Sequence, residues 1–166
     1  MTTDWPNWEP RERANLCFIT RGHEVLLIHK KRGLGAGKIN GPGGRLEPGE
    51  TALEAAVREV GEELGVVPCD PRLRGELSFQ FADGYSLHCA VFLSADCEGE
   101  PVETDEAIPL WVRVDEIPYD RMWADDRHWL PGLLAGRSFR GFFEFDGDRM
   151  VDHRLDWLVT EAPAGA

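Results

Sequence analysis

The sequence predicts an α/β (α+β) fold in which a mixed β-sheet is packed between helices. Short runs of aliphatic and aromatic residues, bounded by turn residues, recur along the chain and are typical of strands. One long amphipathic stretch, residues 51–64, is typical of a helix. No repeat and no linker divides the 166 residues. We therefore expect one domain over residues 1–166, with an ordered core at about 13–157 and short irregular termini.

The first predicted elements form a hairpin. Residues 16–20 and 24–29 are apolar, and the turn-like break between them contains Gly22. Residues 30–50 follow and are rich in glycine and proline. This composition favours an ordered loop over a helix or a long strand.

The second half of the chain alternates strands with one short helix. Strands are predicted at residues 77–81, 86–93, 110–114, 139–145 and 150–155. The last two flank Asp146 and Gly147, which is the signal of a closing hairpin. A second helix is predicted at residues 125–134, and the tail 160–166 is expected to be disordered.

The helix at residues 51–64 has clear boundaries. Thr51 followed by Glu54 forms a capping box, and Gly65 supplies the stop. Four apolar residues recur at spacings of four, three and four: Leu53, Val57, Val60 and Leu64. This spacing predicts the face that packs on the sheet.

Three carboxylates, Glu59, Glu62 and Glu63, lie on the opposite face of the predicted helix, within about one turn. Like charges at these spacings cost roughly a few tenths of a kcal/mol per pair. A hard cation would relieve the repulsion, and magnesium is usually held by a few carboxylates together with phosphate oxygens. By charge pattern alone, a solvated helix face is the more common explanation.

Composition limits the function classes. With 30 acidic and 18 basic side chains the formal net charge is −12, which opposes the phosphate attraction that general nucleic-acid binding needs. A small anionic substrate remains compatible with this charge, because a bound divalent cation reverses the local sign of an acidic site.

Cysteine spacing and hydropathy predict the cellular compartment of the protein. The four cysteines form no CxxC pair and are expected to be reduced. The N-terminal residues lack the apolar run of a secretory signal, and no stretch reaches the ~18 apolar residues of a membrane helix. We expect a soluble, cytoplasmic protein, monomeric or homodimeric, with no membrane or nucleic-acid partner.

Joined to the preceding loop, the helix resembles the Nudix box. The shared positions, nine within 23 residues, are Gly44, Glu50, Arg58, Glu59, Val60, Glu62, Glu63, Gly65 and Val66. The resemblance implies a Nudix fold with a loop-helix-loop that binds Mg²⁺, or Mn²⁺, and positions water against a phosphoanhydride. It implies metal-binding roles for Glu59, Glu62 and Glu63, one of them also a candidate base.

The same resemblance implies supporting roles for other residues of the box. Arg58 and Glu50 would brace the loop against the helix. Gly43 and Gly44 would let the backbone approach the phosphates, and Gly43 would adjoin the metal.

From residue 15 to residue 155 the chain is similar to the MutT-homologue branch that acts on oxidised purine nucleoside triphosphates. The shared stretches are residues 30–33, 35–37, 40–41, 122–123 and 125–126. The resemblance implies that Asn40, Asp125 and Asp126 read the purine edge and that Trp123 stacks on the base. It implies further pocket positions at Asn15, Lys30 and Phe79, and a carboxylate near the metals at Glu106.

Several of these residues also have a simpler explanation. Asp125 or Asp126 could cap a helix, and Trp123 and Phe79 could be ordinary core residues. Lys30 belongs to a basic loop that solvent alone could explain, and acidic loop residues such as Glu106 usually face solvent.

The chain also departs from that branch. Leu34, Ile39 and Pro42 replace loop aromatics, and Asn15 replaces a threonine. Smaller apolar residues offer less stacking surface, so base specificity could differ from that of the branch.

The leading hypothesis is hydrolysis of 8-oxo-dGTP-type nucleotides to monophosphate and pyrophosphate, which sanitises the nucleotide pool and so serves DNA repair. One alternative is a Nudix reaction on ADP-ribose, a dinucleoside polyphosphate or an unmodified nucleotide. Another is a domain that senses nucleotides without hydrolysis, although binding alone would not require a full set of cation-holding carboxylates.

Overall fold

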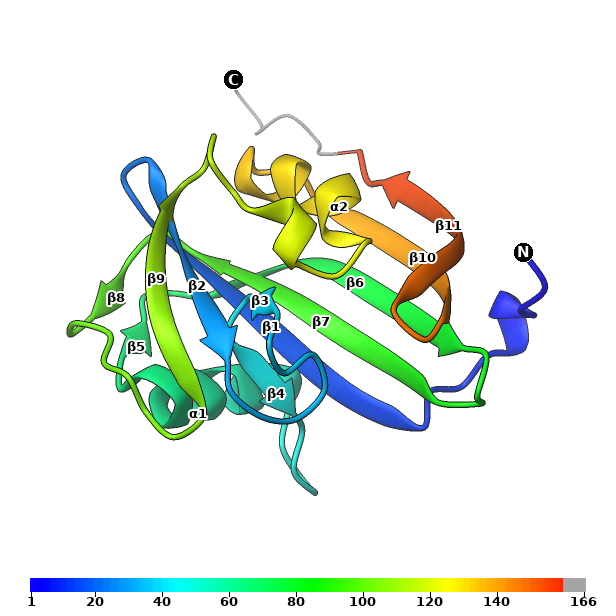
Figure 1. The fold of residues 1–166 in the computed structure, drawn as a ribbon, viewed down its shortest axis with the longest axis horizontal. Coiled ribbons are helices and arrows are strands. Elements are labelled where there is room, and N and C mark those ends of the chain that lie inside the picture. Colours follow the sequence, from blue (N-terminus) through cyan, green and yellow to red (C-terminus); the bar gives the residue numbers. More distant parts are fainter. Residues whose placement is uncertain (160–166) are drawn as a thin grey trace.

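A nine-stranded mixed sheet runs through the computed structural model, which describes residues 1–159 (Figure 1). The main path is β11 (Arg149–Trp157), β10 (Phe139–Asp146), β6 (Arg72–Phe81), β7 (Ser86–Ser94), β1 (Glu12–Arg21), β2 (Glu24–Lys30) and β3 (Ile39–Asn40). In addition, β4 (Gly43–Arg45) pairs with β1, and β9 (Ala107–Arg113) pairs with β2. The pairs β1–β7 and β10–β6 are parallel, and the remaining pairs are antiparallel, so the predicted mixed sheet is confirmed.

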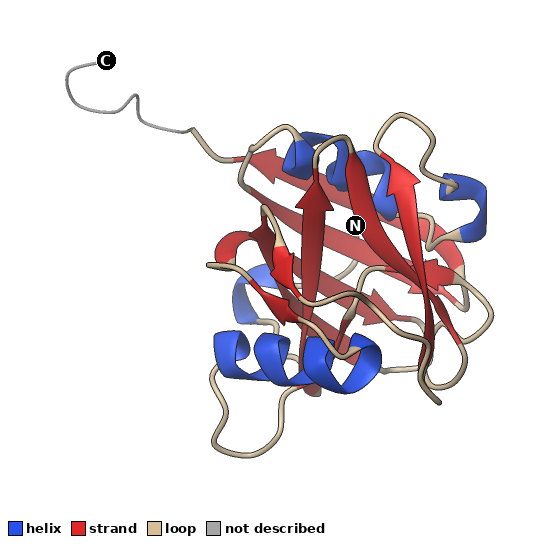
Figure 2. Ribbon diagram, turned by 90° about the vertical axis from the view of Figure 1, so that its left-hand side faces the viewer, coloured by secondary structure: helices blue, strands red, loops and turns tan. Residues whose placement is uncertain are grey.

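Two α-helices cover opposite sides of the sheet, as Figure 2 shows. Helix α1 (Ala52–Leu64) packs against β1 and β4, and helix α2 (Asp126–Leu134) packs against β10. Short 3-10 turns lie at η1 (Trp5–Asn7) and η2 (Tyr119–Arg121). A separate two-stranded sheet joins β5 (Val67–Pro68) to β8 (Cys97–Glu98).

Strand β1 separates two hydrophobic cores. Side chains alternate across a strand, so Cys17 and Ile19 pack with α1, whereas Phe18 packs with Trp129 of α2. The side of the sheet that faces α2 is rich in aromatic rings, including Phe139 stacked on Trp129. This division places the carboxylate helix and the aromatic pocket on opposite sides of β1.

Helix α1 begins and ends as predicted, but its buried face differs from the prediction. The Thr51–Glu54 capping box is present in both directions, and Gly65 ends the helix in the left-handed conformation. Leu53 was expected in the core and is instead 44% exposed. The buried side chains are Ala55, Ala56, Val60, Glu63 and Leu64. The face of α1 that packs on the sheet therefore centres on the two alanines, Val60 and Leu64 and leaves Leu53 outside it.

The predicted strands are present, with altered limits. The first and the last hairpins are confirmed. The loop prediction for residues 30–50 is wrong in part, because β3 and β4 lie within it. Both strands are short and form because they pair with the longer strands β2 and β1, which is tertiary context that local propensity does not register. Strand β9 begins at Ala107, three residues before the predicted start, and β6 begins at Arg72.

The N-terminal residues, expected to be irregular, are held against β10. The backbone N–H groups and hydroxyls of Thr2 and Thr3 donate to the buried carboxylate of Glu144. Trp5 packs edge-on against Phe142. This segment therefore covers part of the sheet face that α1 leaves open. The predicted disorder of residues 160–166 lies outside the described residues.

Within residues 1–159, the length and hydropathy of every helix fall short of what crossing a membrane requires.

Candidate active site

The loop and the helix that carry the box are joined by a buried hydrogen bond. The backbone N–H of Gly43 on β4 donates to Oε1 of Glu63 at 2.7 Å, and Glu63 is only 2% exposed. Glu59 lies directly against Gly44, where a Cβ atom would stand 2.5 Å from its Oε2 and 2.7 Å from its Oε1. Only a glycine at position 44 leaves room for this carboxylate.

Burial and mutual repulsion perturb these carboxylates. Burial raises the pKa of Glu63 to about 8, and the nearby charges of Glu59 and Glu106 act in the same direction. The pKa of Glu59 is also raised, chiefly by burial. The positive charge of Lys30 acts against the rise in the pKa of Glu63. Burial lowers the pKa of Lys30 itself. The site therefore holds more negative charge than its own cations compensate.

Arg58 braces the loop against the helix. Its guanidinium donates to both carboxylate oxygens of Glu50, at 2.7 and 2.8 Å, and to the backbone carbonyl of Arg45 at 3.2 Å. The same group donates to Glu59 at 2.9 Å and to Glu62 at 3.2 Å. The Arg58 hydrogen bonds hold the pKa of Glu50 down, at about 2.

The three helix carboxylates differ in burial, so the prediction that all of them lie opposite the packed face is wrong for Glu63. Glu62 points outward, with a side chain 51% exposed, whereas Glu63 is buried on the sheet side. Within residues 1–159, no group of three or more His, Cys, Asp or Glu side chains is arranged to hold a metal ion. Each of them has a partner within the protein, since Arg58 donates to Glu59 and Glu62 and the Gly43 N–H donates to Glu63.

Glu106 is tied to the end of α1, so it is not a purely solvent-facing loop residue. The Thr104 hydroxyl donates to the Glu63 carbonyl at 2.7 Å and accepts from the Glu106 N–H at 3.2 Å. Arg32 pairs with the Glu106 carboxylate at 3.3 Å. The sequence singled out Glu106 but not Thr104, since a loop threonine carries no signal before its partners are known.

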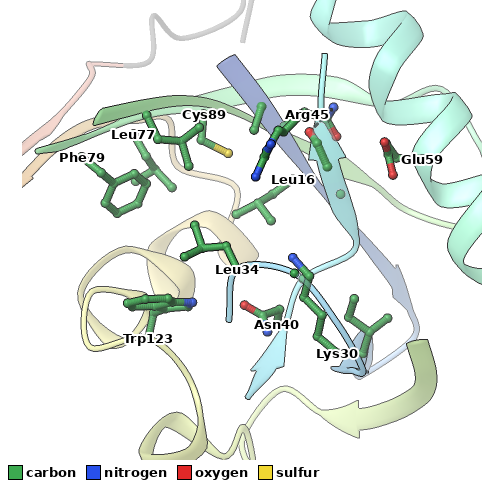
Figure 3. A pocket seen from close by; sticks show the side chains of 18 of the residues that line it. Leu16, Lys30, Leu34, Asn40, Arg45, Glu59, Leu77, Phe79, Cys89 and Trp123 are labelled. Atoms are coloured by element: carbon green, nitrogen blue, oxygen red, sulfur yellow. Dashed lines mark hydrogen bonds between the residues drawn. The ribbon is translucent and has the colours of Figure 1, made fainter. Parts of the chain in front are cut away.

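A cavity of about 450 Å³ extends from these carboxylates across β1 to α2. Figure 3 shows Glu59 at one side of it and Trp123 at the other, with Lys30 and Asn40 between them. The predicted site residues that border the cavity are Asn15, Lys30, Asn40, Gly43, Gly44, Glu59, Glu63, Phe79, Glu106, Trp123, Asp125 and Asp126. The structure thus brings the two halves of the predicted site together.

Asp125 and Asp126 are buried at the α2 end of the cavity, 2% and 7% exposed. Asp125 accepts a hydrogen bond from the indole N–H of Trp129 at 2.8 Å, and neither side chain caps the helix. Burial raises the pKa of both carboxyls, and the charge of Asp125 raises that of Asp126 further. The helix-cap explanation is therefore wrong, and burial of the pair favours the protonated form of each carboxyl.

The amide group of Asn40 is oriented by the glycine-rich loop. Its Nδ2 donates to the carbonyls of Lys38, at 3.2 Å, and Gly35, at 3.5 Å. With the nitrogen engaged in this way, the amide oxygen is the group available to the cavity. Gly35 also lies against Trp123, because a Cβ there would stand 2.8 Å from the indole nitrogen. Asn40 and Trp123 thus converge on one glycine.

The aromatic residues serve both the core and the cavity. Phe79 stacks on buried Phe143, with ring centroids 5.6 Å apart, and also lines the cavity. Trp123 meets Phe81 and Phe145 at nearly perpendicular angles. Phe79 and Trp123 therefore both pack against the core and border the cavity, and the stacking of Trp123 on a base stays a prediction.

Asn15 is paired with Gly44 where β1 meets β4. Its side chain lies on the same side of β1 as those of Cys17 and Ile19, which is the side that faces α1. Its Nδ2 donates to the Gly44 carbonyl at 3.2 Å, while its buried Oδ1 has no hydrogen-bond partner within residues 1–159. Asn15 borders the cavity, but its side chain supports the loop.

The fold and the loop-helix site together define a NUDIX protein. The family model described as NUDIX domain matches residues 10–133, and the chain belongs to this family. Its members are hydrolases that generally use divalent metal ions.

Two of the relatives carry the name oxidized purine nucleoside triphosphate hydrolase. The chain is 43% identical over 143 residues to the oxidized purine nucleoside triphosphate hydrolase of Danio rerio, covering 85% of this chain and 92% of the relative. It is 39% identical over 142 residues to the Mus musculus protein of the same name, covering 84% and 91%. A crystal structure of a MutT protein from Bacillus halodurans superposes with a TM-score of 0.77 at 31% identity, covering 87% of this chain and 97% of that one.

Proposed function

We propose that this protein hydrolyses oxidised purine nucleoside triphosphates of the 8-oxo-dGTP type to the monophosphate and pyrophosphate, using a divalent metal ion. The observation that carries the proposal is the continuous cavity of about 450 Å³. It joins the carboxylates Glu59 and Glu63 to the buried pair Asp125 and Asp126. A polyphosphate at one end and a purine at the other would fill it together. The biological role would be to sanitise the nucleotide pool.

The donor set fits a hard divalent cation. Glu63 is a buried carboxylate whose pKa is raised to about 8, and the charges of Glu59 and Glu106 contribute to that rise. A cation beside them would remove this repulsion, and oxygen donors favour magnesium or manganese over softer metals. Magnesium keeps several waters and takes phosphate oxygens as ligands, so these carboxylates need not form a complete cage by themselves.

In the proposed reaction, Glu59, Glu62, Glu63 and Glu106 would hold the metal, together with the backbone at Gly43. When bound, the metal would neutralise phosphate oxygens and favour attack by water at the inner anhydride. Glycines at positions 43 and 44 let the chain approach the phosphates without side chains. Arg58 holds the Glu59 carboxylate in place, and Lys30 attracts the triphosphate from across the cavity.

The α2 end of the cavity offers complementary groups to a purine. The aspartate pair retains a proton, so one carboxyl donates while the other accepts. The Asn40 oxygen adds an acceptor, and Trp123 supplies a flat surface. An oxidised purine carries both N–H groups and carbonyl oxygens on its edges, which match this set.

A nucleotide panel tests the proposal. We expect magnesium-dependent release of pyrophosphate and monophosphate from 8-oxo-dGTP, with kcat/KM at least roughly tenfold above that for dGTP. Chelation of the metal should abolish the release. Preference for ADP-ribose or a dinucleoside polyphosphate would assign another Nudix reaction. Saturable nucleotide binding without pyrophosphate release would identify a sensor.

A further inference from the structure

The indole ring of Trp123 has a cation on one of its faces. The ammonium nitrogen of Lys38 lies 5.2 Å from the ring centroid of Trp123. Trp123, Asn40 and Leu34 all line the cavity, whereas Lys38 is not among the described residues that do so. The ammonium group therefore packs over the ring of Trp123, although Lys38 is not among the residues that border the cavity.

Lys38 is held in this place by contacts at both of its ends. Its ammonium group pairs with Asp148, in the turn between β10 and β11, at 3.6 Å. Its backbone carbonyl accepts from the Lys30 N–H at 3.1 Å and from Asn40 Nδ2 at 3.2 Å. One residue thus connects the glycine-rich loop, the Asn40 amide and the closing hairpin around Trp123.

The loop that carries Lys38 needs such a connection. Gly33, Gly35 and Gly37 all have φ between +82° and +86°, a region that glycine enters freely. A segment with three such residues has many alternative conformations, and fixing it costs conformational entropy. Contacts that restrict it before the ligand arrives reduce the cost of binding.

We propose that Lys38 is a positioning residue for base recognition. It holds the ring of Trp123 in place so that the ring is presented flat to a purine, and it fixes the Asn40 amide through its own carbonyl. This inference rests on the proposed function, in that Trp123 is taken as the surface on which the base stacks. Lys38 itself contacts neither the base nor the reacting phosphates.

Kinetics of three variants test the clamp. Lys38→Met keeps an unbranched side chain one atom shorter and removes the charge, so we expect KM for the preferred purine triphosphate to rise about two- to fivefold with kcat unchanged. This is the range that a partly exposed cation–π contact supports. Lys38→Arg should restore KM, and Asp148→Asn should raise it in the same direction but less. Arg137→Met is the matched control, because it removes a cation–π contact with Trp157 outside the cavity.

A double-mutant cycle separates the clamp from general attraction of phosphate. In a Trp123→Leu background, Lys38→Met should leave KM unchanged. An equal rise in KM in the wild-type and the Trp123→Leu backgrounds would overturn the proposal. So would a fall in kcat of Lys38→Met that is as large as its rise in KM. The same double-mutant cycle is also measured without turnover, as the dissociation constant of 8-oxo-dGMP by calorimetry in magnesium-free buffer. Absence of pyrophosphate release would therefore refute the proposed function and leave the clamp testable by binding.

Discussion

The backbone N–H of Gly43 donates to the carboxylate of Glu63 across the junction between β4 and α1, at 2.7 Å. A neutral amide oxygen can accept the same bond, so Glu63→Gln separates folding from chemistry. We predict that kcat falls roughly 100-fold or more, since metal ligands supply several kcal/mol of charge stabilisation. The melting temperature in metal-free buffer should be equal to or above that of the wild type. Near-normal turnover would remove Glu63 from the metal site.

The close approach of Gly44 to Glu59 gives a second prediction. In Gly44→Ala the new methyl group would displace the flexible Glu59 carboxylate, so activity should be lost while the fold persists. Gly61→Ala is the matched control, because it lies on the exposed side of α1 with open space around it. We expect that control to retain activity and to gain about 0.5–1 kcal/mol of stability. Steady-state rates and thermal denaturation measure both effects.

The brace made by Arg58 depends on a planar, forked donor. Lysine cannot donate to both oxygens of Glu50 and also reach Glu59, so Arg58→Lys should lower activity roughly tenfold or more. Its melting temperature should also fall. Arg113→Lys, at an exposed pair with Asp115, should change neither quantity. Equal changes of activity and melting temperature in Arg58→Lys and Arg113→Lys would contradict the role assigned to Arg58.

The aspartate pair predicts how stability depends on pH. Because the folded-state pKa values of Asp125 and Asp126 are raised, the folded protein binds more protons than the unfolded chain. The wild type should therefore lose stability as pH rises from about 4 through the raised pKa values, with a slope of at most about 1.4 kcal/mol per pH unit for each carboxyl. Asp126→Asn removes one titrating group and should show a shallower loss. If the wild type and Asp126→Asn lost unfolding free energy in parallel as pH rises, the shared-proton arrangement would be contradicted.

Trp129 provides a test of how Asp125 is oriented. Its indole N–H donates to Asp125 at 2.8 Å, and both groups are buried. Trp129→Phe removes this donor and should raise KM for a purine triphosphate several-fold, with a smaller effect on kcat. The variant also leaves a small cavity in the core, so its stability should fall by roughly 1–3 kcal/mol. The change in KM should persist at temperatures well below its melting transition.

The sequence by itself determined the elements whose signals are local. The capping box at Thr51 and Glu54, the stop at Gly65 and the turn at Asp146–Gly147 all appear where the pattern predicted. These features depend on hydrogen bonds between residues close in the chain, so nearby residue types suffice to specify them. The spacing of the box also marked the carboxylates that border the cavity.

Only the tertiary structure decided which carboxylates are buried and which groups orient them. Glu62 and Glu63 are neighbours, yet one faces solvent and the other lies under Gly43, because the position of β4 selects the covered face of α1. Thr104 and Lys38 acquire their roles in the same way, through partners far away in sequence. Helical periodicity fixes relative directions along one element, whereas burial depends on what packs against it.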